Sequence, residues 1–323
     1  MEKTQKGRWR YGFKRWFVLL FIVLGIIGAN YYSPIRPHIQ VAPERISHAP
    51  LFTLPIIGDF YLTNTLIATV IVDIILIAVA WIVRNAVKKG EMIPGGIAGA
   101  VEALLEVLYG LTESTAGRYT RKIFPYFATI ILVVFVANMM ELIPGVDSIG
   151  ALEPSDHGYS TQTILPGIEA IVQSGAGEHA GGFIVLPYVR VLSTDLNFTV
   201  ALAIISVFMT QVIGFQAQGM RYFTKFVNTT TIFSKPLFGA IDFAVGFLEL
   251  ISEFAKLLSF SFRLFGNIFA GAVLLFLVGS LIPVFAQSTI LLFEFFIGLI
   301  QAFVFGMLTM VFMSMATQHH GEE

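Results

Sequence analysis

The chain contains no cysteine among its 323 residues, which excludes disulfide bonds, thiolate metal sites and cysteine catalysis. It also lacks a phosphate-binding loop, a His-Glu zinc pattern and a serine hydrolase motif, so we expect no cofactor, no metal site and no self-contained enzyme. Charged residues make up only 13 % of the chain, against about 25 % in soluble proteins. Together with 56 % hydrophobic residues and a mean hydropathy of +0.78, this scarcity indicates an integral membrane protein. The net charge of −1 does not suggest nucleic-acid binding.

Apolar runs long enough to cross a bilayer, which takes about 20 residues, recur along the chain. They lie near Trp16–Tyr32, Tyr61–Val83, Phe124–Ile143, Leu196–Phe215, Leu237–Leu281 and Ser288–Ala316. The fifth run exceeds the length of a perpendicular crossing, so its helix is either tilted or partly embedded. We therefore predict an all-α integral membrane protein with about six membrane-crossing helices, ending in a long tilted helical hairpin.

The first apolar run permits two interpretations. A basic segment, an apolar core at Phe17–Gly28 and small residues at Gly28–Ala29 are typical of a cleavable signal peptide. The core is long and Ile27 suits a cleavage site poorly, which favours an uncleaved anchor. Cleavage would leave five crossing helices.

Basic residues concentrate in alternate segments between the apolar runs. Because cytoplasmic loops are enriched in Lys and Arg, we expect the N-terminus, residues 84–123, residues 217–235 and the C-terminus on the cytoplasmic side, most simply of a bacterial inner membrane. Residues 92–120 place Leu104, Leu108 and Leu111 at helical spacing, which predicts an amphipathic helix on the cytoplasmic surface. Residues 144–191, rich in Gly, Pro, Ser and His, are expected to form an external loop insertion.

Arg263 is the only charged residue in the apolar run Leu257–Leu281. A charge at bilayer depth costs roughly 3 kcal/mol on insertion scales and therefore usually faces a polar path or a partner. Snorkelling to the interface would require a nearby helix end, yet ten or more apolar residues separate Arg263 from Pro283. Arg263 also shares one helix face with other polar residues, over roughly 27 Å at 1.5 Å per residue. These residues are Glu249, Lys256, Ser259 and Asn267, and we interpret them as one wall of a hydrated path.

The last apolar run repeats this pattern with fewer polar residues. Glu294 and Gln301 are seven residues apart and share a helix face, with Gly298 between them. The two runs join near Pro283–Ser288, which predicts an antiparallel hairpin with Arg263 and Gln301 at comparable depth. A carboxyl group at the depth of Glu294 can carry a proton, although it can also be a neutral group that hydrogen-bonds a neighbouring helix.

Three further polar residues are weaker candidates. Asp195 and Asn197 open the fourth crossing from the outside, where they serve either as helix N-caps or as a channel mouth. Asp73 lies within the second crossing, and a proton-path role and a packing role are equally compatible with that position.

Two stretches, Ser261–Gly271 (SFRLFGNIFAG) and Leu299–Met315 (LIQAFVFGMLTMVFMSM), closely resemble the C-terminal signature helices of subunit a of F-type ATP synthases. Asp195–Thr199 (DLNFT) resembles the start of the preceding span in that family. The resemblance is close from about residue 192 to the end and looser over Phe52–Leu142. An arginine followed by LFGN on one helix, with QAF on the next, is a specific match.

The resemblance implies roles for the polar residues. It implies that Arg263 is the essential charge between two half-channels, that Asn267 and Gln301 accompany it, and that an aqueous path follows Glu249, Lys256 and Ser259. The family commonly carries an ionisable residue directly after the AG of the motif, where this chain has Ala272. The proton relay near Asp195 and Asn197 would then depend on Glu294 alone.

The implied device is a stator subunit that lies against a rotating ring of c subunits and couples proton flow to ATP synthesis. Its implied partners are the c-ring, b-type peripheral stalk subunits, the remaining FoF1 complex and lipid. On this basis we divide the single membrane domain, residues 1–323, into an anchor or signal (1–33), first core helices (34–143, with the amphipathic helix at 92–120), the external insertion (144–191) and proton-path helices (192–323). The sequence does not distinguish H⁺ from Na⁺, although no dense set of oxygen ligands for Na⁺ is visible.

Two alternatives remain open at this point. A stand-alone ion or anion transporter would use Arg263 as a substrate-binding charge, but no internal repeat of the kind common in transporters is present. A purely structural membrane anchor would leave the intramembrane charges unexplained.

Overall fold

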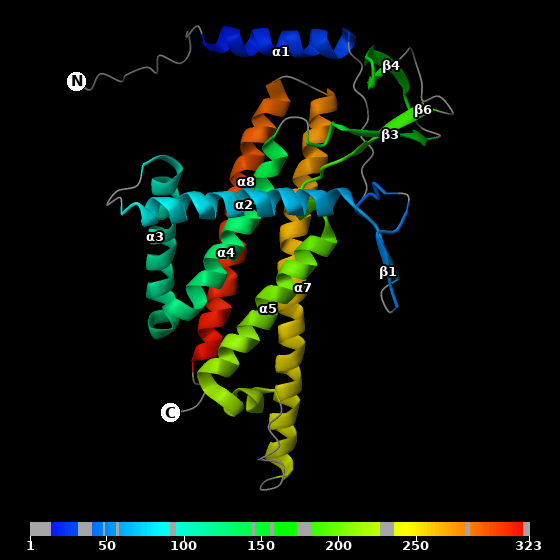
Figure 1. Ribbon diagram of the computed structural model, residues 1–323. Coiled ribbons are helices and arrows are strands. Elements are labelled where there is room, and N and C mark those ends of the chain that lie inside the picture. Colours follow the sequence, from blue (N-terminus) through cyan, green and yellow to red (C-terminus); the bar gives the residue numbers. More distant parts are fainter. Residues whose placement is uncertain are drawn as a thin grey trace, which may run out of the picture. The chain divides into compact units, whose positions relative to one another are not determined.

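The computed structural model of the chain describes residues 14–31, 41–47, 49–55, 58–90, 95–143, 146–155, 158–172, 182–226, 236–281 and 285–318. The α-helices in these segments are α1 (Lys14–Tyr31), α2 (Asn64–Lys88), α3 (Gly96–Ala116), α4 (Thr120–Met139), α5 (Leu196–Gln218), α7 (Pro236–Leu281) and α8 (Phe285–Thr317) (Figure 1). Each predicted crossing coincides with one of them. The predicted amphipathic helix corresponds to α3, and the residues before Lys14 and at 32–33 in the predicted anchor lie outside the described segments.

Five helical stretches in the described part of the chain are long and apolar enough to cross a membrane: 64–88, 96–142, 196–223, 244–279 and 286–317. They confirm the prediction of a helical integral membrane protein. The first predicted crossing is helical, as α1, but is not among the five. Helix α7 has 46 residues, equivalent to about 69 Å at 1.5 Å per residue, which is over twice the hydrocarbon thickness of about 30 Å.

Local sequence signals account for where several helices begin and end. The hydroxyl of Thr63 accepts a hydrogen bond from the Leu66 amide at 3.3 Å and so caps the start of α2. Gly117 follows α3 with a φ of +51°, a conformation that favours glycine. The chain then reverses through the short 3₁₀ helix η2 (Gly117–Tyr119) into α4.

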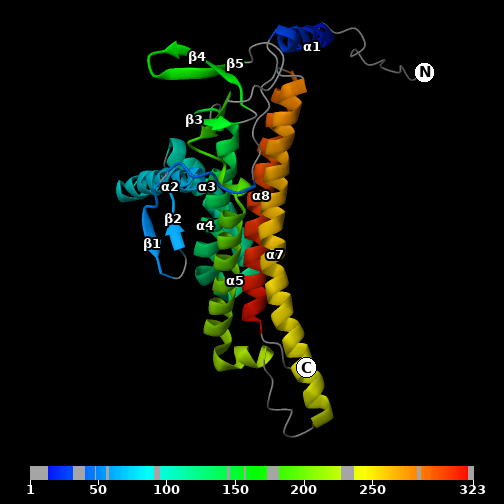
Figure 2. The same ribbon diagram turned by 90° about the vertical axis from the view of Figure 1, so that its right-hand side faces the viewer.

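The connecting segments contain short strands, whereas the all-α prediction anticipated only loops there. The strands are β1 (Phe52–Leu54), β2 (Gly58–Phe60), β3 (Gly150–Ser155), β4 (Ser160–Leu165), β5 (Ile168–Val172) and β6 (Gly182–Pro187). Strands β1 and β2 pair with each other, as do β3 with β6 and β4 with β5. Gly167, at a φ of +86°, permits the tight turn of the β4–β5 hairpin seen in Figure 2. The molecule is therefore mostly helical, and the described part of residues 144–191, the predicted insertion, contains hairpin structure.

The chain divides into two compact units. The larger unit comprises residues 40–149, 187–269 and 295–323, and the smaller one comprises residues 1–39, 150–186 and 270–294. The core of the larger unit lies where α4, α5, α7 and α8 meet. Its buried side chains include Ile130, Val134, Leu202, Ala203, Phe260, Leu264, Ile268, Ala302 and Phe305. A second core joins α3 to α4, α5 and α8, and a third joins α2 to α4.

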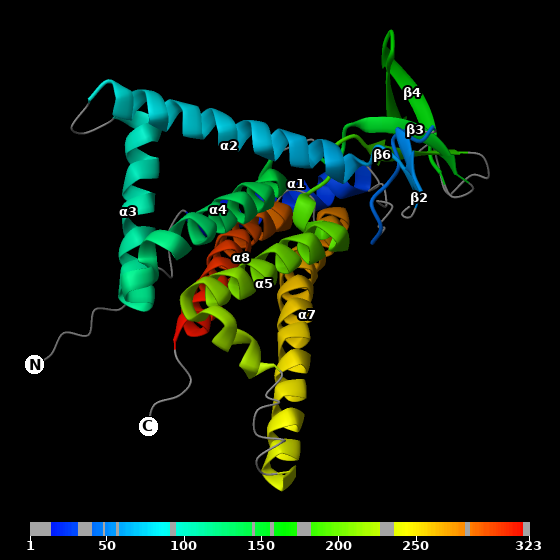
Figure 3. The ribbon, with the colours of Figure 1, turned by 60° about the horizontal axis from the view of Figure 1, so that its bottom comes forward.

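Glycines on α8 allow α4 to approach closely. A side chain at Gly306 would collide with Ile131, and one at Gly298 would lie 3.1 Å from the Cβ atom of Asn138. The sequence analysis placed Gly298 on the polar face of the last apolar run, and α4 is the helix that it contacts. Helix α2 instead crosses α4 steeply (Figure 3) and contacts it through Ala68 and Val72.

Candidate functional site in the membrane helices

The predicted polar stripe lies on one continuous helix, α7, as expected. Ser259, Arg263 and Asn267 are exposed on its outward face, whereas Glu249 and Lys256 are half-buried. The guanidinium of Arg263 donates to the Ser259 hydroxyl at 3.4 Å, a long contact one helical turn away. No described residue lies within 4 Å of the position that a Cβ atom would take at Gly266, so this face of α7 is open beside Arg263.

The opposite face of α7 fixes the depth of Arg263 in the bundle. The rings of Phe260 and Phe305 lie 5.2 Å apart, and Leu264 is buried in the same core as Ala302. Arg263 and Gln301, which neighbour Leu264 and Ala302 in sequence, therefore lie at similar levels of the antiparallel helices, as expected. Gln301 is buried, and in the described segments neither it nor Asn267 hydrogen-bonds to Arg263.

Glu294 belongs to the smaller unit, where its carboxyl group lies against Gly271. The side chain is only 3 % exposed, and neither carboxyl oxygen has a hydrogen-bond partner among the described residues. A Cβ atom at position 271 would collide with that carboxyl group. Glycine at 271 is therefore required for Glu294 to take this place. The adjacent Ala272 is buried and apolar, consistent with its exclusion from the candidate site.

The lower part of the stripe contains an ion pair that sequence reasoning missed. The ammonium of Lys256 lies 2.8 Å from Oε1 of Glu253, one turn earlier on α7, and 4.9 Å from the ring centre of Phe312. Glu253 was overlooked because it lies beside the seven-residue repeat that links Glu249, Lys256 and Arg263. Its three-residue spacing from Lys256 was the available signal.

Asp195 is the N-cap of α5, one of the two roles considered for it. Its carboxylate accepts a hydrogen bond from the Asn197 amide at 2.9 Å, and its side chain is 4 % exposed. The Asn197 side chain itself is exposed. Just before Asp195, the short 3₁₀ helix η4 (Leu192–Thr194) contributes Ser193 to a buried network.

This buried network ties η4, α4 and α8 together. The Ser193 hydroxyl donates to Oδ1 of Asn138 at 2.5 Å, and Nδ2 of Asn138 donates to the Gly298 carbonyl at 3.0 Å. Asn138 and Ser193 are both almost completely buried. Sequence reasoning missed them, although an asparagine inside the apolar run 124–143 was a usable signal. The network holds the residues before Asp195 against the helix that carries Gln301.

Two other acidic residues lie outside these clusters. Asp73 is exposed on α2, and neither of its two considered roles gains support from that position. Glu141, directly after α4, is buried, and sequence reasoning did not single it out.

Asp147 and Arg190 lie in the segment 144–191, outside the membrane helices, and their charges interact. Burial raises the pKa of Asp147 to about 6, and the nearby charge of Arg190 opposes part of this shift. Arg190 also donates to the Thr194 hydroxyl and to the Ala42 carbonyl, each at 3.1 Å. It therefore ties the segment before α2 to the entry of α5.

Together these features define a class of protein: a polytopic helical membrane protein whose longest helix presents an arginine on an open face, with a buried carboxyl group on the next helix. The chain belongs to the ATP synthase A chain family, whose sequence model matches residues 66–314.

Curated relatives agree with this assignment. The chain is similar to ATP synthase subunit a of a Nitratiruptor species, at 26 % identity over 57 % of this chain and 59 % of the relative. It is also similar to subunit a of Rhodospirillum rubrum, at 25 % identity over 68 % and 70 %, and of Helicobacter hepaticus, at 28 % identity over 61 % and 64 %. The matches thus span about three-fifths to seven-tenths of the relatives' lengths. They are bacterial, and the chain is an integral membrane protein.

Proposed function

We propose that the chain is the proton-translocating, non-catalytic stator subunit of an F-type ATP synthase. One observation carries the proposal: Arg263 is exposed on an open face of α7 and is the only charged residue in the apolar stretch Leu257–Leu281. A charge at that depth requires a counter-charge or water. In the described segments its polar contact is the long one to Ser259, so another chain is the natural source of the counter-charge.

The partner that fits this face is a ring of c subunits whose helices each carry a carboxylate at the depth of Arg263. The gap beside Gly266 gives such a helix room to approach. Family membership supports association with the other ATP synthase subunits, and the peripheral stalk would anchor this chain against the torque of the ring.

The proposed path consists of two offset half-channels. Protons enter from outside past Asp195, Asn197 and Glu294 and neutralise a ring carboxylate, which can then move into lipid at little cost. After almost a full turn the ring site reaches the exit path along Glu249, Lys256 and Ser259. Arg263 lies between the paths with Asn267 and Gln301, where its charge favours release of the ring proton and opposes direct leakage. Each charge moved supplies roughly 2.3 kcal/mol per 100 mV.

This path requires the cytoplasmic orientation of the C-terminus deduced from the basic residues, with residues 144–191 outside and α3 on the cytoplasmic surface. We retain the proposed division into anchor or signal (1–33), first core helices (34–143), insertion (144–191) and proton-path helices (192–323). A bacterial plasma membrane is the proposed location, and the proton the proposed ion.

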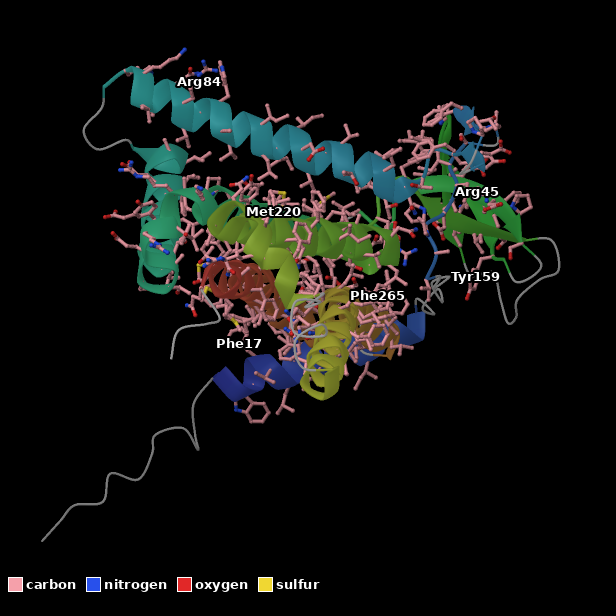
Figure 4. All side chains as sticks on the ribbon, turned by 90° about the horizontal axis from the view of Figure 1, so that it is seen from below. Phe17, Arg45, Arg84, Tyr159, Met220 and Phe265 are labelled. Carbon is pink, nitrogen blue, oxygen red and sulfur yellow. The ribbon has the colours of Figure 1, made fainter. Side chains whose placement is uncertain are left out.

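The test is Arg263→Ala in the whole complex, reconstituted in vesicles. We expect ATP-driven proton pumping to fall by at least about a hundredfold while passive proton leak persists or rises, because the barrier between half-channels is lost. Arg84→Ala, which removes an exposed arginine at the end of α2 (Figure 4), is the matched control and should pump normally. Pumping that survives Arg263→Ala would overturn the proposal.

A further inference from the structure

A cluster of polar residues in the larger unit comes from α5, α7 and the short helix that follows α5, which sequence reasoning did not connect. We call it the Tyr222 cluster; its members are Gln211, Tyr222, Glu253 and Lys256. Gln211 belongs to α5, Tyr222 to the following 3₁₀ helix η5 (Gly219–Lys225), and the two charged residues to α7. The labelled Met220 marks η5 in Figure 4.

The tyrosine is held rigidly on its side of the cluster. Tyr222 is 3 % exposed and its hydroxyl donates to Oε1 of Gln211 at 2.7 Å. Its ring lies directly on Gly214, where a Cβ atom would collide with it. In Figures 1 and 2, η5 lies beside the first half of α7, which carries Glu249 and Glu253. The electrostatic influence of Glu253 and, less strongly, Glu249 on the Tyr222 phenol agrees with this arrangement. The phenol and its glutamine therefore belong to the elements next to the α7 carboxylates.

The amide of Gln211 indicates water in this cluster. Its Nε2 atom is buried and has no hydrogen-bond partner among the described residues, whereas its carbonyl oxygen accepts from Tyr222. An unsatisfied buried donor costs about 1–3 kcal/mol, and ordered water is its usual partner in such a place. A water molecule held there would lie beside Tyr222, on the side of α5 that faces the cluster.

The ion pair between Glu253 and Lys256 on α7 is not explained by its contribution to stability. Lys256 and Glu253 have side chains only 23 % and 13 % exposed, and a buried ion pair generally adds little stability over apolar residues of similar size. Intramembrane ionisable groups are by default functional. Glu253 is ten residues before Arg263, about 15 Å along the helix, and so lies beyond Ser259 in the direction of the exit path.

We propose that Glu253 is the proton-carrying group of the exit half-channel, and that Tyr222 and Gln211 are positioning residues that form its opposite wall. The inference rests on the proposed proton path and adds a carrier to it. A ring carboxylic acid gives its proton to water near Ser259, and the carboxylate of Glu253 accepts that proton, forming one O–H bond. The bond then breaks to cytoplasmic water and the carboxylate is restored. Lys256 stays protonated throughout, and no electrons are transferred.

The experiment compares variants in the whole complex, with proton flux in vesicles normalised to the amount of assembled complex. Glu253→Gln is isosteric but cannot carry a proton, so we expect pumping and passive conductance through the ring to fall by about tenfold or more. Glu253→Asp keeps the carboxylate and should restore flux to within a few-fold. Tyr222→Phe should lower flux by about fivefold, the equivalent of one ordinary hydrogen bond. Glu106→Gln, which removes an exposed carboxylate on α3, is the matched control and should pump normally.

A second measurement separates a proton carrier from a merely structural pair. Because this chain contains no cysteine, Glu253→Cys introduces one thiol into it. In inside-out vesicles a charged, water-soluble methanethiosulfonate should label that thiol, whereas Leu250→Cys, on an exposed apolar position, should resist labelling. A structural pair predicts an unlabelled thiol and unchanged normalised flux in Glu253→Gln, and either result would overturn the inference.

The outcome for Arg263→Ala keeps the two proposals distinguishable. If that variant loses pumping while Glu253→Gln is unaffected, only the inference about Glu253 fails. If Arg263→Ala pumps normally, the proposed function itself fails.

Discussion

Several polar side chains in the interior of the larger unit hydrogen-bond to distant parts of the chain, whereas those on the open face of α7 make only the long contact between Arg263 and Ser259 in the described segments. Inside, Asn138 is satisfied by Ser193 and the Gly298 carbonyl, and the hydroxyls of Ser206 and Thr309 bond across α5 and α8 at 2.7 Å. Outside, Arg263 and Asn267 face open space. Interior polar groups therefore stabilise the bundle, and the outward ones are available to a partner.

The two kinds of glycine show the same contrast most strongly. An added Cβ atom at Gly306 would collide with Ile131 of α4, whereas one at Gly266 would have no described residue within 4 Å. We expect Gly306→Val to separate α4 from α8, at a cost of about 3 kcal/mol or more, and to lower the amount of folded subunit sharply. Gly266→Ala should accumulate at least as well as the native chain, because alanine is the better helix former. Quantifying the subunit in membranes and its thermal stability after purification tests both. Equal accumulation of the two variants would contradict the comparison.

Removing one interior partner should have an intermediate effect. Asn138→Ala leaves the Ser193 hydroxyl and the Gly298 carbonyl without their bonds, which should cost about 2 kcal/mol. Ser114→Ala removes an exposed hydroxyl that bonds only to the Leu111 carbonyl of its own helix, so it serves as the control with little change. Thermal unfolding of the purified complex in detergent measures the difference. A destabilisation no larger than that of Ser114→Ala would show that the network is dispensable.

The smallest expected effect on stability concerns Asp147, an ionisable residue that is largely buried outside the membrane helices. Burial raises the pKa of Asp147 from its ordinary value of 3.8 to about 6, so the folded chain binds this proton more tightly than the unfolded chain. The resulting stabilisation is fully present below pH 3.8 and is lost as the pH rises through 6. Asp147→Asn should therefore stabilise the protein by about 1 kcal/mol at a pH of about 7.5, after allowance for partial exposure, and have no effect at low pH.

Thermal midpoints of the native chain and Asp147→Asn across this pH range test the sign. Asp59→Asn, an exposed carboxyl on β2, is the control. A stabilisation that grows as the pH falls would contradict the assignment to Asp147.

Much of the helical architecture was predictable because a membrane helix can be identified from a local run of apolar residues of sufficient length. Apolar length located α2, α4, α5, α7 and α8, and the seven-residue spacing placed Arg263 and its companions on one face of α7. The strands between residues 150 and 187 were not predicted, because their short alternating stretches resemble a polar loop when read locally. Likewise Ser193, Tyr222 and Gln211 carry no pattern of their own, since each acquires its contacts from another element of the fold.

The sequence by itself determined the chemistry of the protein. It shows an apolar chain, an isolated Arg263 in a specific motif, and the carboxyl group of Glu294 inside the last apolar run. Periodicity along one helix is a local property, so it can be read from the sequence without knowledge of the fold. Only the tertiary structure decided which faces are covered and which are open. It placed α4 against the glycines of α8, the Glu294 carboxyl against Gly271, and the Tyr222 ring against Gly214, because close packing between distant segments depends on shapes that no single segment contains.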